Sequence, residues 1–216
     1  MVNLKEIAVS GMSCDRTLLW LAAPEERLVI AYDPSSGRLE EKLTYSYEVW
    51  DVCPHEEGLW MLTGGGKLGR QLVLWSLIED KEMRRFHCPD GAGAGMTIME
   101  GKLWLTHRHN RKLFCLDSQS GKTNWVIRTE NESFSPAAYK SEFWFIESDP
   151  GPLGHWSASQ QGRYFFSRFD LARERIVERL AVPFAPACMT FDGERFWYAE
   201  PRKKGIASVL FSNLQS

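Results

Sequence analysis

A short phrase that recurs along the whole chain is the feature that most constrains its fold. The phrase joins a hairpin turn to an apolar strand that carries a tryptophan, as in Gly101-Lys102-Leu103-Trp104-Leu105. Its five copies are separated by steps of 40, 44, 40 and 53 residues, and their tryptophans are Trp20, Trp60, Trp104, Trp144 and Trp197. A fixed period of about 40–50 residues marks a repeat architecture built from one supersecondary unit. We therefore predict an all-β chain folded as a five-bladed β-propeller, with these tryptophans packed between adjacent blades.

Each repeat divides into four strands separated by turn residues. In the first repeat, the strand Leu28–Tyr32 is followed by the turn Asp33–Gly37 and the strand Arg38–Leu43. Proline presets φ in such a turn, and glycine accepts the positive φ that closes it. The third repeat has the same layout, with a turn at Asp117–Gly121. This pattern predicts four antiparallel strands in each blade.

The two ends of the chain complement each other. Asn3–Val9 has a strand-like apolar pattern with no blade before it, and the last repeat lacks an outer strand after Phe211. We expect Asn3–Val9 to pair with the last blade and close the ring, because closure protects strand edges. Five repeats use nearly all of the 216 residues, which predicts one propeller domain over residues 1–216.

Composition and charge argue against several classes of protein. The net charge of −2 does not favour a nucleic-acid-binding face. The sequence contains no run of roughly 18 apolar residues, which a membrane helix would need. Its first residues do not have the pattern of a secretory signal. The five cysteines are an odd number without a CxxC pair, which indicates reduced thiols. We expect a cytoplasmic protein that binds neither nucleic acid nor membranes.

Candidate functional positions lie three residues after each tryptophan, where loops from second to third strands reach one mouth of the channel. These positions are Ala23, Thr63, His107, Glu147 and Glu200. Rigid scaffolds commonly carry function on such loops, and we expect all five positions to point toward the same mouth. His107, Glu147 and Glu200, joined by His109, could bind a divalent metal through nitrogen and oxygen. A metal-free proton-transfer or substrate site and solvated loop ends are the open alternatives.

The loop after Glu147 is far longer than its counterparts in the other repeats. It runs to Gly162 and carries His155 and Trp156 at its centre. Long loops in compact domains are often functional lids, so we predict a lid, the alternative being a loop that packs on the rim. Trp50 and Trp156 lie outside the repeat phrase, and we expect them, with His109 and His155, to contact a ligand.

One repeat resembles a known motif. Ala185–Glu200 is similar to the "P-x-G-L-A-W-D-G-x-x-L-W-V-A-D" repeat of glutamine-cyclotransferase-like propellers, and its Trp197-x-x-Glu200 ending also resembles the repeats of seven-bladed virginiamycin B lyase-like propellers. The resemblance covers nearly the whole chain. It is specific for the fold and indicates activity poorly, because one fold hosts many functions.

A second stretch extends this resemblance to a site. Phe145-Ile146-Glu147-Ser148, followed by Gly151, Gly154 and Ser157, resembles the F-E-S-x-G-x-x-G-x-S stretch around the catalytic glutamate of five-bladed plant and bacterial glutaminyl cyclotransferases. The resemblance implies the catalytic role for Glu147. This chain departs from the pattern by the residue between Phe145 and Glu147 and by its longer loop.

Two functions of different classes follow from these observations. The first is an enzyme or binding protein for a small polar molecule at the channel mouth, of the cyclotransferase (acyltransferase) or lyase type. Glu147 would be the acid or base, and Glu200 and His107 would assist it or bind a divalent metal. The alternative is a non-catalytic scaffold that presents one face to a protein partner. A concave pocket with convergent polar groups favours the first, and a flat apolar face favours the second.

Overall fold

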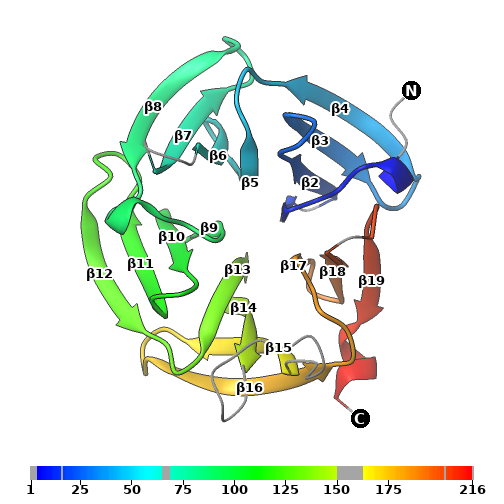
Figure 1. Cartoon of the computed structure of the whole chain (residues 1–216), viewed down its shortest axis with the longest axis vertical. Coiled ribbons are helices and arrows are strands. Elements are labelled where there is room, and N and C mark those ends of the chain that lie inside the picture. The colour runs from blue at the N-terminus through cyan, green and yellow to red at the C-terminus, as the bar shows by residue number, and fades with distance from the viewer. Residues whose placement is uncertain (1–3, 16, 65–68, 150–162, 202, 216) are drawn as a thin grey trace.

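Five antiparallel sheets stand around a central axis like the blades of a propeller (Figure 1). The computed structural model describes residues 4–15, 17–64, 69–149, 163–201 and 203–215. The sheets follow one another around the ring in chain order, and each begins with its innermost strand. The predicted five-bladed β-propeller is confirmed.

The strands of each blade form a simple meander from the axis outward. Blade one contains β1 (Gly11–Asp15), β2 (Leu18–Ala23), β3 (Leu28–Asp33) and β4 (Arg38–Thr44). Blade two contains β5 (Val49–His55), β6 (Gly58–Gly64), β7 (Arg70–Ser76) and β8 (Lys81–His87). Blade three contains β9 (Met96–Met99), β10 (Lys102–His107), β11 (Lys112–Asp117) and β12 (Thr123–Arg128). Blade four contains β13 (Glu132–Tyr139), β14 (Glu142–Asp149), β15 (Arg163–Asp170) and β16 (Arg175–Val182), and blade five contains β17 (Cys188–Phe191), β18 (Arg195–Ala199) and β19 (Ala207–Leu210).

Short 3-10 helices lie outside the sheets in the described part of the chain. They are η1 (Leu4–Glu6), η3 (Pro89–Gly91) and η4 (Phe211–Leu214). None of the helices among the described residues has the length and apolar character that a membrane span requires.

The predicted turn chemistry is present in blades one and three. The Asp33 carboxylate accepts hydrogen bonds from the backbone N–H of Ser35 at 2.8 Å and from the hydroxyls of Ser35 and Ser36. These bonds lower the pKa of Asp33 to about 2. Gly37 then closes the turn at φ 71°, a left-handed conformation that glycine adopts without steric cost. The aspartate and glycine of the turn between β11 and β12 repeat this arrangement.

The core of the protein is divided among the five seams between neighbouring blades. Each seam has its own cluster of buried apolar side chains, and each repeat tryptophan packs in the seam between its own blade and the next one. Trp60 and Trp144 are completely buried. Both faces of a blade are covered because successive side chains of a strand point to opposite faces. The structural role predicted for the five tryptophans is confirmed.

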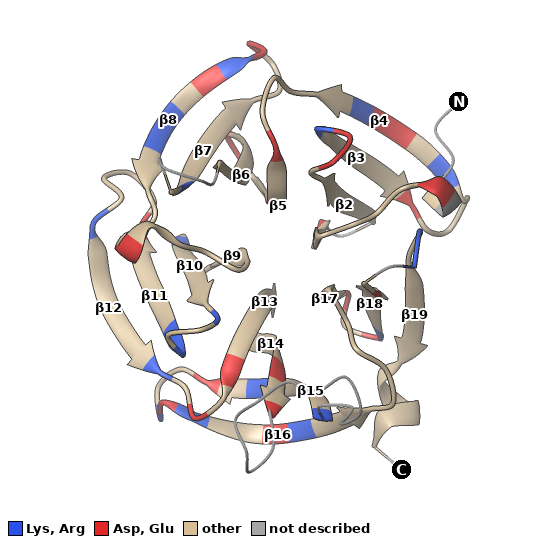
Figure 2. Cartoon of the chain, in the orientation of Figure 1, with Lys and Arg blue, Asp and Glu red and all other residues tan. Residues whose placement is uncertain are grey.

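Charged side chains gather on the outermost strands, as Figure 2 shows for β4, β8 and β16. In β4 the side chains are mostly exposed. Charges on such strands discourage pairing with a strand of another molecule.

Near the axis, polar groups tie one blade to the next. The Ser10 hydroxyl donates to the carbonyl of Trp50 at 2.8 Å, and the Asp51 carboxylate accepts the backbone N–H of Met96 at 2.7 Å. Asp51 also accepts the N–H of Val52 at 2.9 Å. Only 3% of Asp51 is exposed, and this burial raises its pKa to about 7 although the two backbone hydrogen bonds act in the opposite direction.

The N-terminal segment joins blade five, but not as the predicted strand. Leu4–Glu6 is a 3-10 helix, and the following residues form no ladder with the described strands β17, β18 and β19. Instead, the N–H of Gly205 donates to the carbonyl of Ile7 at 2.9 Å, and Ile7 and Val9 are buried in the seam between blades five and one. The N–H of Ile7 bonds back to Leu4, which turns the chain away from a strand register. The ring is therefore closed by the packing of Ile7 and Val9 and by the hydrogen bond from Gly205, and not by strand pairing.

Candidate functional site

The mouth positions predicted from the repeat lie in different seams. Trp104 faces the seam toward blade four, whereas His107, three residues along β10, lies in a cavity with Arg70 of blade two. An odd step along a strand reverses the face. For the same reason, Glu147 of β14 faces blade three while Trp144 faces blade five. Side chains related by the repeat thus enter separate seams and do not converge on the axis.

Glu147 is buried and fully occupied by hydrogen bonds. Arg179 of β16 donates through Nε to Oε2 at 2.8 Å and through Nη2 to Oε1 at 2.9 Å. Asn131 donates to Oε1 at 2.8 Å, and the Ser167 hydroxyl donates to Oε2 at 2.9 Å. A carboxylate offers about four acceptor sites, so these contacts leave no open site for a substrate proton.

Glu200 and the metal-binding set are similarly separate. Glu200 follows β18 and accepts a hydrogen bond from the Lys203 ammonium at 2.9 Å. In the described residues, no three His, Cys, Asp or Glu side chains come together as a group able to hold a metal. His107, Glu147 and Glu200 are all described, and the structure does not bring them together.

A cavity of about 450 Å³, here called the mouth-face pocket, lies at the boundary of blades two and three. Its lining residues come from the start of β7, the connection from η3 to β9 and the end of β10: Gly69, Arg70, Gly91, Ala92, Gly93, Ala94, His107, Arg108 and His109. The guanidinium carbon of Arg70 lies 3.9 Å from the centroid of the Trp50 ring. Of the predicted site residues, His107 and His109 therefore line one pocket, and Trp50 contacts a third lining residue, Arg70.

His107 has the environment of a neutral imidazole. It is 8% exposed, and its Nε2 lies 3.4 Å from the side-chain nitrogen of Asn110. Burial lowers the pKa of His107, and the negative charge of Asp90 only partly opposes this effect. A histidine that is neutral near pH 7 can accept a proton from a bound molecule.

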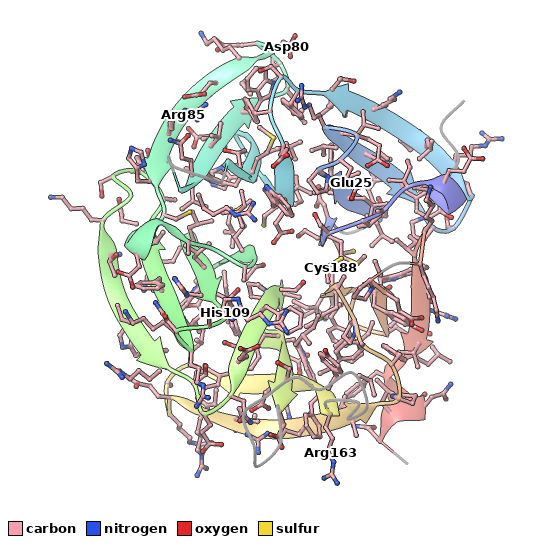
Figure 3. All side chains as sticks on the ribbon, viewed as in Figure 1. Glu25, Asp80, Arg85, His109, Arg163 and Cys188 are labelled. Carbon is pink, nitrogen blue, oxygen red and sulfur yellow. The ribbon has the colours of Figure 1, made fainter. Side chains whose placement is uncertain are left out.

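His109 belongs to a polar cluster at the edge of the same pocket, on the inner side of the ring (Figure 3). Its Nδ1 lies 3.2 Å from Oε1 of Glu132, and Nε of Arg108 donates to Oε2 of Glu132 at 2.8 Å. Burial raises the pKa of Glu132, but the hydrogen bonds from Arg108 and His109 outweigh it, so the pKa is lowered overall. Glu132 is therefore a carboxylate that holds the β10–β11 connection against β13.

Sequence reasoning missed Arg70 and Glu132. Both are first residues of a strand, β7 and β13, and both lie on the face that was predicted to carry function. In every blade, the first and third strands begin at the mouth at which the second strand ends. The first residues of those strands are therefore the sequence positions that could have indicated Arg70 and Glu132. His155 and Trp156, with most of the predicted lid, lie outside the described residues.

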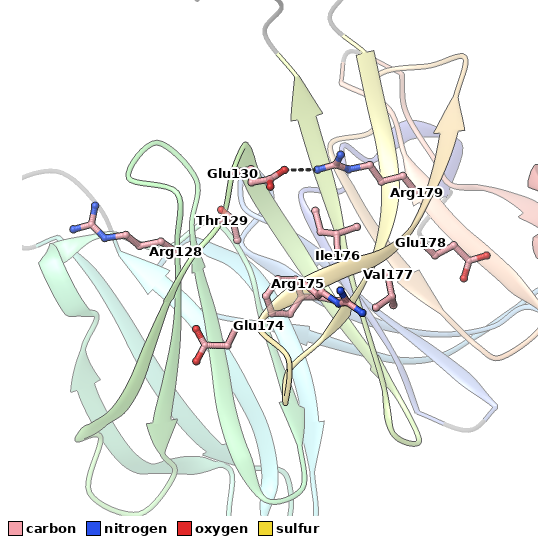
Figure 4. A pocket seen from close by; sticks show the side chains of 10 residues that line it. Arg128, Thr129, Glu130, Glu174, Arg175, Ile176, Val177, Glu178 and Arg179 are labelled. Carbon is pink, nitrogen blue, oxygen red and sulfur yellow. Dashed lines mark hydrogen bonds and ion pairs between the residues drawn. The ribbon is translucent and has the colours of Figure 1, made fainter.

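Two further cavities lie between the outer parts of blades three and four. One, of about 510 Å³, is lined by Arg128, Glu130 and Arg175 among others, and Figure 4 shows the ion pair of Glu130 with Arg179 at its edge. The other, of about 670 Å³, contains Trp104 and Trp125. Of the predicted site residues that the structure describes, none lines either cavity.

Comparisons with known proteins support the fold. No family model and no curated protein matches the sequence. Glutaminyl cyclase from Myxococcus xanthus superposes with a TM-score of 0.67 at 12% identity, over 96% of this chain and 93% of that one. U3-55K gives a TM-score of 0.55 at 11% identity, over 94% of this chain and 81% of that one.

A hydrazine synthase chain from Kuenenia stuttgartiensis also gives a TM-score of 0.55, at 10% identity. The match covers 91% of this chain and 56% of the synthase chain, so the present chain spans little more than half of that protein's length. At such identities these likenesses show the fold alone. The resemblance to glutamine-cyclotransferase-like propellers inferred from the repeat is thus confirmed as a resemblance of fold.

Proposed function

We propose that this chain is a small-molecule-binding propeller whose site is the mouth-face pocket. The observation that carries the proposal is the meeting of His107, His109 and the Trp50–Arg70 stack around one cavity of about 450 Å³. Ligand pockets typically have volumes of about 300–1,000 Å³ with a few convergent polar groups. A small polar molecule fits this description better than a flat protein surface does.

For an enzymatic role, we assign proton acceptance to His107 in place of Glu147. A general base needs a free lone pair within reach of the substrate. The acceptor sites of Glu147 are filled by Arg179, Asn131 and Ser167. The Nε2 of the neutral His107 on the pocket wall meets the Asn110 amide at 3.4 Å, a contact longer than an ordinary hydrogen bond and more easily replaced by a ligand. Glu147 then acts as a structural anchor of the seam between blades three and four.

The reaction to assay first is acyl transfer of the glutaminyl cyclotransferase type. The fold shared with the Myxococcus glutaminyl cyclase supports this choice. A peptide with N-terminal glutamine would be incubated with the wild type, with His107→Asn and with Glu147→Gln, and release of ammonia would be followed. Our assignment predicts that His107→Asn loses any activity. Activity that depends on Glu147 and not on His107 would contradict it.

Binding is tested separately from catalysis. With ¹³C-labelled histidine, a library of small polar metabolites should shift the ring resonances of His107 and His109. His87, exposed on the outer strand β8, supplies a matched control resonance that should not move. If no compound shifts the two pocket histidines selectively, the small-molecule proposal fails, and a protein partner becomes the function to pursue.

A further inference from the structure

The mouth-face pocket contains an arginine without a carboxylate partner among the described residues. The guanidinium of Arg70 lies over the Trp50 ring, and its Nη1 donates to the carbonyl of Gly64 at 3.1 Å. A guanidinium has five N–H donors, so this contact uses a small part of its capacity. In the part of the chain that the structure describes, no ion pair involves Arg70, in contrast to these arginines with carboxylate partners: Arg84, Arg85, Arg108, Arg168, Arg173 and Arg179.

The cost of this arrangement is electrostatic. Burial lowers the pKa of Arg70, and the negative charge of Glu48 opposes this effect only in part. A partly desolvated cation is unfavourable unless an anion compensates it. Stacking on Trp50 fixes the plane of the guanidinium and reduces the entropy lost when a ligand binds.

The rest of the described pocket lining supplies no negative charge to Arg70. Its described lining contains Arg70, Arg108, His107 and His109 and no aspartate or glutamate. Arg108 is paired with Glu132, which leaves Arg70 as the arginine of the wall that has no ion pair among the described residues. The backbone of Gly91 closely approaches Gly69, the residue before Arg70, since a Cβ at Gly69 would lie 2.9 Å from the carbonyl oxygen of Gly91.

We propose that the mouth-face pocket binds the anionic end of its ligand, a carboxylate or a phosphate group, on the guanidinium of Arg70. This inference rests on the proposed function, because it names the ligand class of the same site. The planar fork of an arginine matches either anion through two parallel hydrogen bonds. His107 and His109, which line the same pocket, then contact the remainder of the molecule.

The test uses the intact protein with two probes, inorganic phosphate and succinate, each compared with chloride at equal ionic strength. Saturable shifts of the His107 and His109 resonances are expected with at least one probe, and the difference between the probes distinguishes phosphate from carboxylate. Arg70→Gln should weaken that binding by about tenfold or more. Arg70→Lys keeps the charge but loses the fork and the stacking, and should weaken it by a smaller factor.

Arg85→Gln is the matched control. Arg85 lies on the outer strand β8 of the same blade (Figure 3) and does not line the pocket, and its replacement changes the net charge equally. Equal binding in the wild type and in Arg70→Gln would overturn the inference, as would equal losses in Arg70→Gln and Arg85→Gln. If Arg70→Gln does not fold, the wild-type response to the anions and the loss in Arg70→Lys decide the question.

The experiments distinguish an error in the proposed anionic ligand from an error in the proposed binding site. Neutral compounds that shift His107 equally in the wild type and in Arg70→Gln, with no response to either anion, would refute the anion and leave the proposed function standing. If neither anions nor neutral compounds shift the pocket histidines, both proposals fall.

Discussion

Replacing Asp51 with asparagine should change how the stability of the protein depends on pH. The Asp51 carboxyl is buried near the axis, and its pKa is raised from 3.8 to about 7 by burial. Between these two values, the folded state holds a proton that the unfolded chain has lost. The free energy of unfolding therefore falls as the pH rises through this range.

The size of the effect follows from the two pKa values. Each pKa unit corresponds to about 1.4 kcal/mol, so Asp51 contributes a decrease of about 4 kcal/mol between pH 4 and 7. An asparagine at this position would remain neutral throughout and remove this slope. The side-chain amide of the variant would turn its own N–H donor toward a backbone N–H from which Asp51 now accepts a hydrogen bond. This mismatch should cost about 1–3 kcal/mol of stability, and the cost does not vary with pH.

The assay is urea unfolding of the wild type and Asp51→Asn at pH 5, 6, 7 and 8. The stability advantage of the wild type over the variant should shrink by about 2–3 kcal/mol from pH 5 to 7 and then level off. Subtraction removes the contributions of other titrating groups, which the two proteins share. Asp15→Asn, at the exposed end of β1, is the control and should show no such change. An advantage that is the same at pH 5 and pH 8 would refute the reasoning.

Three further outcomes can be checked on the same material. Arg179→Ala leaves the buried Glu147 carboxylate without its bidentate partner and should lower the free energy of unfolding in urea by about 3–5 kcal/mol. Arg173→Ala, in an exposed turn, is the control and should change the stability by less than about 0.5 kcal/mol. Similar losses in both variants would contradict the anchoring role of Glu147. Trp144→Ala removes a completely buried side chain from its seam and should cost about 3–5 kcal/mol, so a loss below about 1 kcal/mol would show that the seam repacks. His107 should titrate below its usual pKa in an NMR titration, and its lowered pKa should make stability fall as the pH drops below about 6.5, because the unfolded chain then binds more protons; an unchanged or raised midpoint would contradict burial as the cause.

The recurring tryptophans were enough to predict the fold. Their spacing gives the length of the repeat, and each of them packs between two neighbouring blades. Trp20 and Trp60 each occupy the seam ahead of their own blade, and the same rule holds around the ring. Turn residues then indicated the strand boundaries, as at Asp33 and Gly37. Local chemistry and repeat position agreed in these segments, so the sequence pattern was sufficient.

The candidate site was predicted less well, for a geometric reason. Positions three residues after the tryptophans share a face of the propeller but enter separate seams, which is why His107 and Glu147 lie apart. Neither the bidentate pairing of Glu147 with Arg179 nor the stacking of Arg70 on Trp50 has a local sequence signal. Both depend on which residues of different blades or strands face one another, and that information is tertiary.

The N-terminal segment failed as a strand for a similar reason. Its apolar residues Ile7 and Val9 do reach the seam of blade five, as their hydrophobicity requires. The 3-10 turn at Leu4–Glu6 depends on a backbone hydrogen bond that the apolar pattern does not report.

The closing seam between blades five and one also has a consequence for how the chain acquires its structure. There the N–H of Cys14 donates to the Thr190 hydroxyl at 3.1 Å, across 176 positions of sequence. Such a contact cannot form until almost the entire chain has left the ribosome, and closing so large a loop is slow. During synthesis, the apolar flank of blade one stays open to solvent and to other nascent chains. Aggregation during expression should therefore depend more on mutations in this seam than on equally destabilising mutations between blades that are adjacent in sequence.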